Sequence, residues 1–193
     1  MVHLALTGGI AAGKTVVCNI LEILGAVVYY SDVRARNLME SDQTLRNTLV
    51  DYFGDSLYHN EGLNKTFLRD RIFNDKAAQA FVDSVVHPVV LNDYFSWRDT
   101  CEAQFSVIET ALLPRLNIAH EFNSIMAVTA PDELRLQRIM ARDACSESEA
   151  KAKLAAQPDQ EVYCQLAHYV IINDGDRFVS TQVTDILKKL NIK

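Results

Sequence analysis

An α/β fold with a parallel sheet of about five strands is predicted from three observations. Short apolar runs rich in β-branched residues alternate along the chain with helical periodicities, which is typical of parallel-sheet proteins. The 193 residues are 49% hydrophobic, enough for one sizeable core with a small appended subdomain. A glycine-rich turn joins the first apolar run to the first helical pattern, so a strand passes directly into a helix near the start of the chain.

That turn lies in the stretch 6–15, LTGGIAAGKT. Gly8, four intervening residues and then Gly13-Lys14-Thr15 satisfy the spacing G-x-x-x-x-G-K-[ST] of a phosphate-binding loop. Glycine lets the backbone curl so that its N–H groups face phosphate oxygens, and the following helix adds its positive N-terminal end. We expect Lys14 to reach the β and γ phosphates and the Thr15 hydroxyl to ligate Mg²⁺. The strand and helix on either side disfavour the alternative, a glycine-rich turn with an exposed lysine.

The remaining elements follow in order along the chain. The first helix is expected to stop at Gly25, which completes a strand–helix–strand unit whose strands run parallel. The later strands are predicted at 26–30, 105–109, 124–128 and 169–172. Helical patterns cover 34–39, 43–53, 65–73 and 76–85, and further helices are predicted to start at Pro88, Pro131 and Ser146 and to cover 178–190.

These elements predict a single domain with two appendages. The core comprises 1–33, 105–142 and 161–193, a helical insertion covers 34–104, and a charged segment at 143–160 forms a lid. A phosphoryl transferase needs both appendages. One must hold the acceptor, and the other must close over the nucleotide so that water does not take the γ phosphate.

Composition and charge restrict the partners. The formal net charge is −6, so nothing in the overall field favours nucleic acid or an anionic membrane. No apolar run approaches the roughly 20 residues that span a bilayer. The four cysteines show no paired spacing, and the N-terminus shows no secretion pattern, so we expect reduced thiols and a cytoplasmic protein. A monomer is expected, with an oligomer left open.

Three charged side chains are candidates for chemistry. Asp32 follows the second predicted strand at the carboxyl end of the sheet, where it would position or deprotonate an acceptor hydroxyl or help to hold Mg²⁺ through water. Alternatively, Asp32 caps the next helix. Arg138 and Arg142 are four residues apart and share a helix face, where they either neutralise the transferring phosphoryl group or pair with nearby carboxylates in solvent.

Two further positions have open interpretations. His87 precedes Pro88, so it either caps the helix that the proline begins or donates to an acceptor. Glu109 ends the third strand and would lie near Mg²⁺ or hold the acceptor. The other histidines show no metal-ligand spacing.

Over essentially its whole length the chain resembles the dephospho-coenzyme A kinases. The resemblance rests on LTGGIAAGKT at 6–15, YSDVRAR at 30–36, HP at 87–88, APDELRLQRIMARD at 130–143, AAQ at 155–157 and YVIINDG at 169–175. It implies transfer of the ATP γ-phosphoryl group to the ribose 3′-hydroxyl of dephospho-CoA, with Mg²⁺ as cofactor. It also implies a three-layer P-loop NTPase core with a helical acceptor-binding insertion and a short helical lid.

The matching motifs imply roles for individual residues. Asp32, Lys14 and Arg142 are implied to be catalytic. The ATP site is implied to comprise Gly9, Ala11, Ala12, Gly13, Lys14, Thr15, Val16, Arg138, Arg142, Asn173 and Gly175, with Mg²⁺ on Thr15. The acceptor site is implied to comprise Thr7, Asp32, Arg36, His87 and Glu109.

Several positions depart from the family pattern. Ala11 and Ala12 stand where the family usually has Gly and Ser, and ATP binding is expected to survive if the backbone φ there is negative. The segment 111–115, ALLPR, lacks the usual carboxylate. Tyr163 and His168 replace a common basic residue and a common Asp.

Three other functions are alternatives for a chain with this loop. Another P-loop small-molecule or nucleoside monophosphate kinase would keep the fold and change the acceptor. A GTP-hydrolysing switch needs an Asn-Lys-x-Asp guanine reader, and Asn64-Lys65-Thr66-Phe67 lacks the Asp. A binding protein with a degenerate ATP site is disfavoured by intact Lys14, Thr15 and Asp32.

Overall fold

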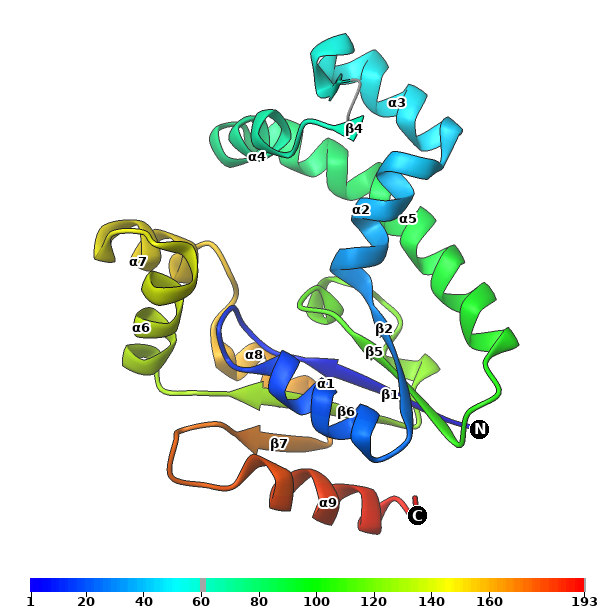
Figure 1. Cartoon of the computed structure of the whole chain (residues 1–193), viewed down its shortest axis with the longest axis vertical. Helices are drawn as coiled ribbons and strands as arrows, with labels where there is room; N and C mark the ends of the chain where they lie inside the picture. The colour runs from blue at the N-terminus through cyan, green and yellow to red at the C-terminus, as the bar shows by residue number, and fades with distance from the viewer. Residues whose placement is uncertain (60–61, 193) are drawn as a thin grey trace. The chain divides into compact units, whose positions relative to one another are not determined.

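The computed structural model describes residues 1–59 and 62–192 (Figure 1). The chain divides into two compact units, one of residues 1–29 and 101–193 and the other of residues 30–100. We call them the sheet unit and the helical unit. The sheet unit carries the glycine-rich turn, and the helical unit contains most of the predicted insertion.

The sheet has five strands in the order β2-β5-β1-β6-β7, which confirms the predicted fold class. Their bounds are β1 Val2–Thr7, β2 Ala26–Tyr30, β5 Phe105–Glu109, β6 Ser124–Thr129 and β7 Tyr169–Ile172. β1 runs parallel to both β5 and β6, with Leu4 opposite Val107 on one side and Ser124 on the other. β6 and β7 are also parallel. β5 lies between β1 and β2, so the two strands of the first strand–helix–strand unit do not pair directly.

Helices on both faces make the sheet unit a three-layer structure (Figure 1). The helices are α1 Lys14–Ile23, α6 Asp132–Asp143, α7 Glu147–Ala155, α8 Gln160–Leu166 and α9 Val179–Lys189, with 3₁₀ turns η2 Leu113–Arg115 and η3 Ala119–Glu121. α1 and α9 pack together, and α8 packs on β6. β1 is the centre of the core, because Leu4, Ala5 and Leu6 are fully buried. Burial on both sides is why this strand reads as a continuous apolar run.

The start of α7 was predicted correctly because its signal is local. The Ser146 hydroxyl accepts from the Glu149 N–H, and the Glu149 carboxylate accepts in return from the Ser146 N–H. This reciprocal capping satisfies two backbone donors that a helix start leaves without partners.

The described part of the helical unit contains four α-helices, one 3₁₀ turn and a short hairpin. Its elements are α2 Ser31–Ser41, α3 Gln43–Phe53, η1 Asp55–Leu57, β3 Tyr58–His59, β4 Gly62–Leu63, α4 Lys65–Asn74 and α5 Lys76–Thr100. The antiparallel hairpin of β3 and β4 was not predicted, because two-residue strands carry no periodicity.

The predicted helix break at Pro88 is wrong. α5 continues through Pro88, so this residue lies inside a 25-residue helix and His87 is not a cap. Proline removes one backbone hydrogen bond and normally kinks a helix. Here Val86, Val90 and Tyr94 are buried on one face of α5, which packs against α2, α3 and α4. Tertiary packing on both sides of the proline therefore outweighs the local cost. None of the described helices is both long and apolar enough to cross a membrane.

Candidate active site

The turn between β1 and α1 folds as a compact loop, which we call the Gly8–Thr15 loop. Gly13 has a left-handed backbone (φ 104°) and directly precedes α1. A Cβ atom on Gly13 would overlap the side-chain amide of Asn173, so both the conformation and the space require glycine. Ala11 also has a positive φ, of 58°, which contradicts the expected negative value. The loop holds an alanine in a conformation that costs about 1–2 kcal/mol.

Lys14 folds back over the loop. Its Nζ donates to the carbonyl oxygens of Gly8 at 3.0 Å and Gly9 at 3.4 Å, and lies 3.6 Å from Oε1 of Glu109. Glu109 reaches this position because it ends β5, next to β1 in the sheet. The sequence prediction placed Glu109 near the metal or the acceptor. In the structure it pairs with the lysine of the loop.

The neighbouring residues of the loop differ in exposure. Thr15 and Val16 are exposed in the first turn of α1, and the Thr15 hydroxyl has no hydrogen-bond partner among the residues that the structure describes. Thr7, the last residue of β1, is fully buried, and its hydroxyl lacks a partner within the described chain.

Arg138 and Asn173 hold the loop from outside. Nη1 of Arg138 donates to the Ala11 carbonyl at 3.2 Å and lies 3.4 Å from that of Ala12. Nη2 of Arg138 donates to the backbone oxygen of Asn173 at 3.2 Å, and the Asn173 amide donates to the Ala12 carbonyl at 2.9 Å. The two predicted nucleotide residues thus meet each other and the loop. Gly175 lies two residues further on, in a left-handed turn with open space around it.

Two residues that sequence reasoning did not select bind the same loop. Arg135, on α6, is only 4% exposed. Its Nε donates to the Ile10 carbonyl at 3.0 Å, and Oε1 of Gln157 accepts from the Ile10 N–H at 2.6 Å. Both backbone groups of Ile10 are therefore held by side chains from α6 and from the segment after α7. The i, i+3 spacing of Arg135 and Arg138 was the available signal, since it places both on one side of α6.

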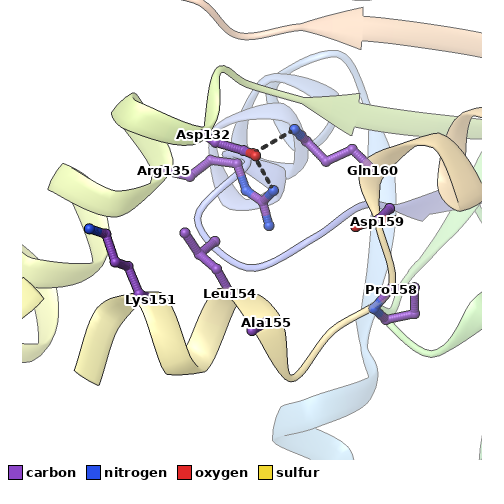
Figure 2. A pocket seen from close by; sticks show the side chains of 8 residues that line it. All are labelled: Asp132, Arg135, Lys151, Leu154, Ala155, Pro158, Asp159 and Gln160. Atoms are coloured by element: carbon purple, nitrogen blue, oxygen red, sulfur yellow. Dashed lines mark hydrogen bonds and ion pairs between the residues drawn. The ribbon is translucent and has the colours of Figure 1, made fainter. Parts of the chain in front are cut away.

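A cavity of about 470 Å³ lies behind this contact, between α6, α7 and the start of α8 (Figure 2). Oδ1 of Asp132 accepts from Nη1 of Arg135 at 2.9 Å and from the Gln160 amide at 3.1 Å. Gln160 also bonds both the N–H and the carbonyl of Ala130. Arg135 is thus fixed on both sides, by Asp132 and by the loop.

Arg142 points to a different partner. Its Nε donates to Asp143 at 2.7 Å, and Nζ of Lys153 donates to the same carboxylate at 2.5 Å. The Arg142 hydrogen bond, followed by that of Lys153, holds the pKa of Asp143 far below its usual range. The bond to Asp143 likewise raises the pKa of Arg142. This group ties the last turn of α6 to α7, and among the described residues no hydrogen bond or ion pair joins Arg142 to the loop.

The predicted acceptor residues of the helical unit lie on two helices. Asp32 is exposed in the first turn of α2, and no side chain caps this helix, so the interpretation of Asp32 as a cap is wrong. Within residues 1–59 and 62–192, the side chains of Asp32 and Arg36 have no hydrogen-bond or ion-pair partner. His87 lies in α5, with Nε2 3.4 Å from Oδ1 of Asp83 one turn earlier.

The donor set of the sheet unit fits Mg²⁺ bound together with a nucleotide. Within residues 1–59 and 62–192 there is no cluster of three His, Cys, Asp or Glu side chains that could hold a metal. Mg²⁺ in kinases needs no such cage, because phosphates and waters supply most of its ligands. The exposed Thr15 hydroxyl and the Glu109 carboxylate are oxygen donors of the type that Mg²⁺ prefers.

Comparison with known proteins identifies the family of the chain. A family model described as Dephospho-CoA kinase matches residues 2–178. A dephospho-CoA kinase of Bacteroides fragilis is 32% identical over 187 residues, which cover 96% of this chain and 91% of the relative.

Solved structures show the same fold. A protein of Thermus thermophilus has a TM-score of 0.80 at 25% identity, covering 98% of this chain and 96% of its own. A dephospho-CoA kinase from Campylobacter jejuni has a TM-score of 0.69 at 22% identity, covering 97% and 96%. Shikimate kinase from Acinetobacter baumannii, at 18% identity and a TM-score of 0.53, covers 99% and 93% and shares the fold alone. Because the family model covers most of the chain and the Bacteroides fragilis relative is 32% identical over nearly its whole length, the chain belongs to the dephospho-CoA kinase family.

Proposed function

We propose that this chain transfers the γ-phosphoryl group of ATP to the ribose 3′-hydroxyl of dephospho-CoA, forming CoA and ADP in the last step of coenzyme A synthesis. The observation that carries the proposal is the Gly8–Thr15 loop, with Lys14 folded over it and Glu109 beside it, in a chain of this family. Such loops bind phosphates through backbone N–H groups at a helix N-terminus.

The sheet unit would bind ATP. Loop N–H groups from Gly9 to Val16 would surround the phosphates, and Lys14 would leave the carbonyls of Gly8 and Gly9 for phosphate oxygens. Mg²⁺ would be held by Thr15, with Glu109 nearby, and would neutralise charge on the phosphates. Arg138 and Asn173 would act on the nucleotide by fixing Ala11 and Ala12, and Gly175 would border the adenine.

The helical unit would bind the acceptor. Asp32 would accept the proton of the attacking hydroxyl, a role that suits an exposed carboxylate with no ion pair to any described residue. Arg36 and His87 would bind other parts of the acceptor, and Thr7 and Glu109 are also proposed as acceptor residues. Arg142 would exchange Asp143 for the transferring phosphoryl group when the lid, 143–160, closes.

The partners and the cellular setting are part of the proposal. A net charge of −6 supports small-molecule substrates rather than nucleic acid or an anionic membrane. We expect a cytoplasmic protein and a monomer, with an oligomer open to test by light scattering.

The test is ADP release from ATP and Mg²⁺ with and without dephospho-CoA, with AMP, CMP and shikimate as control acceptors. Release that depends on dephospho-CoA, with CoA formed in equal amount, is expected. Release with another acceptor would instead support another P-loop small-molecule or nucleoside monophosphate kinase. ATP binding without turnover would support a degenerate site.

The proposed role of Asp32 has its own test. Asp32→Asn should lower kcat by orders of magnitude and leave the KM for ATP within about twofold, because the lost interaction belongs to the acceptor step. An equal loss of ATP affinity would point to a metal or structural role.

A further inference from the structure

The helical unit contains a groove of about 400 Å³ between α2, β4 and α4. Three cationic side chains line it: Arg36 from α2, and Lys65 and Arg69 from α4. Met39, Leu63 and Ile72 provide apolar walls, and Met39 and Leu63 are each 8% exposed. The groove therefore combines a cationic part with an apolar part, within a protein whose net charge is −6.

The cations of this groove are weakly compensated. Arg36 is exposed and has no ion pair within the described chain. Lys65 lies 3.8 Å from Glu40, and Arg69 lies 3.5 Å from Asp70, with 67% and 73% of the two basic side chains exposed. Exposed pairs at such distances contribute little, about 0–1 kcal/mol, so both cations can exchange their partners for a stronger anion. A phosphate group is the anion that arginine binds best, through paired N–H donors.

The order of side chains along α2 indicates in which direction a ligand would lie in the groove. Asp32, Arg36 and Met39 are spaced i, i+4 and i+7, so they form one stripe on a single helix face. Arg36 lies about 6 Å along the axis from Asp32, and Met39 about 4.5 Å further, at 1.5 Å per residue. Along α2 the stripe therefore carries a carboxylate, then a guanidinium and then a thioether.

The acceptor carries its chemical groups in the same order. Dephospho-CoA has a ribose 3′-hydroxyl, then a 5′-diphosphate, then a long, largely uncharged pantetheine arm. The 3′-hydroxyl and the 5′-phosphate of a ribose are roughly one helical turn apart, which matches the separation of Asp32 and Arg36. A carboxylate suits the hydroxyl, and a guanidinium suits the diphosphate.

We propose that this groove binds the diphosphate and pantetheine part of dephospho-CoA, with Arg36, Lys65 and Arg69 on the diphosphate and Met39, Leu63 and Ile72 along the arm. The inference rests on the proposed function and deepens it. The groove selects the acceptor by the part of the molecule that does not react, and Asp32, one turn away, receives the hydroxyl.

Calorimetric titration of dephospho-CoA tests the groove without relying on turnover. Arg36→Ala and Arg69→Ala should each weaken binding at least fivefold, and Arg36→Ala should weaken it more, because Arg36 has no internal anion to release. The matched control is Arg71→Ala. Arg71 is an exposed arginine on α4, as Arg69 is, but it lies outside the groove, so the affinity of this variant for dephospho-CoA should stay within twofold of the wild type. Circular dichroism checks that each variant keeps its helices.

A fragment of the acceptor tests where the pantetheine arm binds. 4′-Phosphopantetheine contains the arm and one phosphate but no ribose, so it should inhibit the wild-type enzyme competitively against dephospho-CoA and not against ATP. The inhibition constant should rise at least fivefold in Arg36→Ala and stay unchanged in Arg71→Ala.

The outcomes separate this inference from the function on which it rests. If the wild type makes CoA but Arg36→Ala and Arg69→Ala bind dephospho-CoA as tightly as Arg71→Ala does, the groove is not the site. If 4′-phosphopantetheine competes with ATP, the arm does not lie here. If the wild type releases no ADP with dephospho-CoA, the proposed function itself fails.

Discussion

At the scale of single residues, Ala11 and Ala12 form a natural pair of probes. Ala11 has φ 58°, in the left-handed region, whereas Ala12 has no positive φ and is fully buried. Ala11→Gly should therefore raise the free energy of unfolding by about 0.5 kcal/mol, because relief of about 1–2 kcal/mol of strain exceeds the extra chain entropy of glycine. Ala12→Gly should lower it by about 1 kcal/mol, because it removes a buried methyl group and adds entropy to the unfolded chain.

Urea denaturation of both variants measures these differences. Opposite signs are expected for two neighbouring substitutions of identical chemistry. Equal destabilisation by both would mean that Ala11 is not strained in solution.

The sequence predicted some residues of the site around the Gly8–Thr15 loop but not all of them. Lys14, Thr15 and Gly13 were found because their spacing is fixed by contacts with phosphate, and that spacing is visible in the sequence. Arg135 was missed, because a charged residue on a helix is usually exposed. Its burial depends on Asp132 and on the Ile10 carbonyl, and the second of these contacts joins positions 125 residues apart.

At the scale of elements, α6 is the helix that shapes the loop. We expect Arg135→Met to raise the KM for ATP about tenfold, because the Ile10 carbonyl and Asp132 both lose a charged donor and the loop loses its fixed shape. Steady-state kinetics at varied ATP measure this effect. The control is Arg71→Met on α4, which is exposed and should leave the KM unchanged.

A purely structural role for Arg135 predicts a different result. The melting temperature would then fall while the KM for ATP of the folded enzyme stayed at the wild-type value. Rescue of the KM by Arg135→Lys, which keeps a charged donor, would further support positioning of the loop.

The junction of α6 and α7 should respond to pH through Asp143. Because the folded state depresses the pKa of this carboxyl, its contribution is fully present above the unfolded value, about 3.9. It is lost progressively as pH falls from there through the lower pKa of the folded state. Asp143→Asn should cost about 0.5–1 kcal/mol of unfolding free energy at pH 7, a value kept small by solvent screening at this surface. The difference from the wild type should shrink as pH falls below about 4.

Urea denaturation at pH 7 and pH 3 measures this dependence. Asp55→Asn is the control, because Asp55 is an exposed carboxylate that forms no ion pair within the described part of the chain. A cost for Asp143→Asn that is the same at both pH values would rule out the ion-paired carboxylate as its source.

At the scale of the whole molecule, the strands of the five-stranded sheet were predictable and their order was not. Each of the five strands is a short apolar run bounded by turn residues, so the signal lies within the strand. The position of β5 between β1 and β2 depends on pairing between residues about 100 apart, such as Val2 with Phe105. Pro88 shows the same limit, because its place inside α5 follows from packing that no local pattern records.

ATP with Mg²⁺ should raise the melting temperature of the whole protein. A ligand that binds only the folded state at about 100 times its Kd adds about 2.7 kcal/mol. At roughly 2–4 °C per kcal/mol for a chain of this size, the expected rise is about 5–10 °C.

Lys14→Ala should lose more than half of that rise, because it removes the cation that the loop offers to phosphate. Lys188→Ala, an exposed cation on α9 paired with Asp185, should keep it. Scanning calorimetry measures both, and an undiminished rise in Lys14→Ala would place the nucleotide away from the Gly8–Thr15 loop.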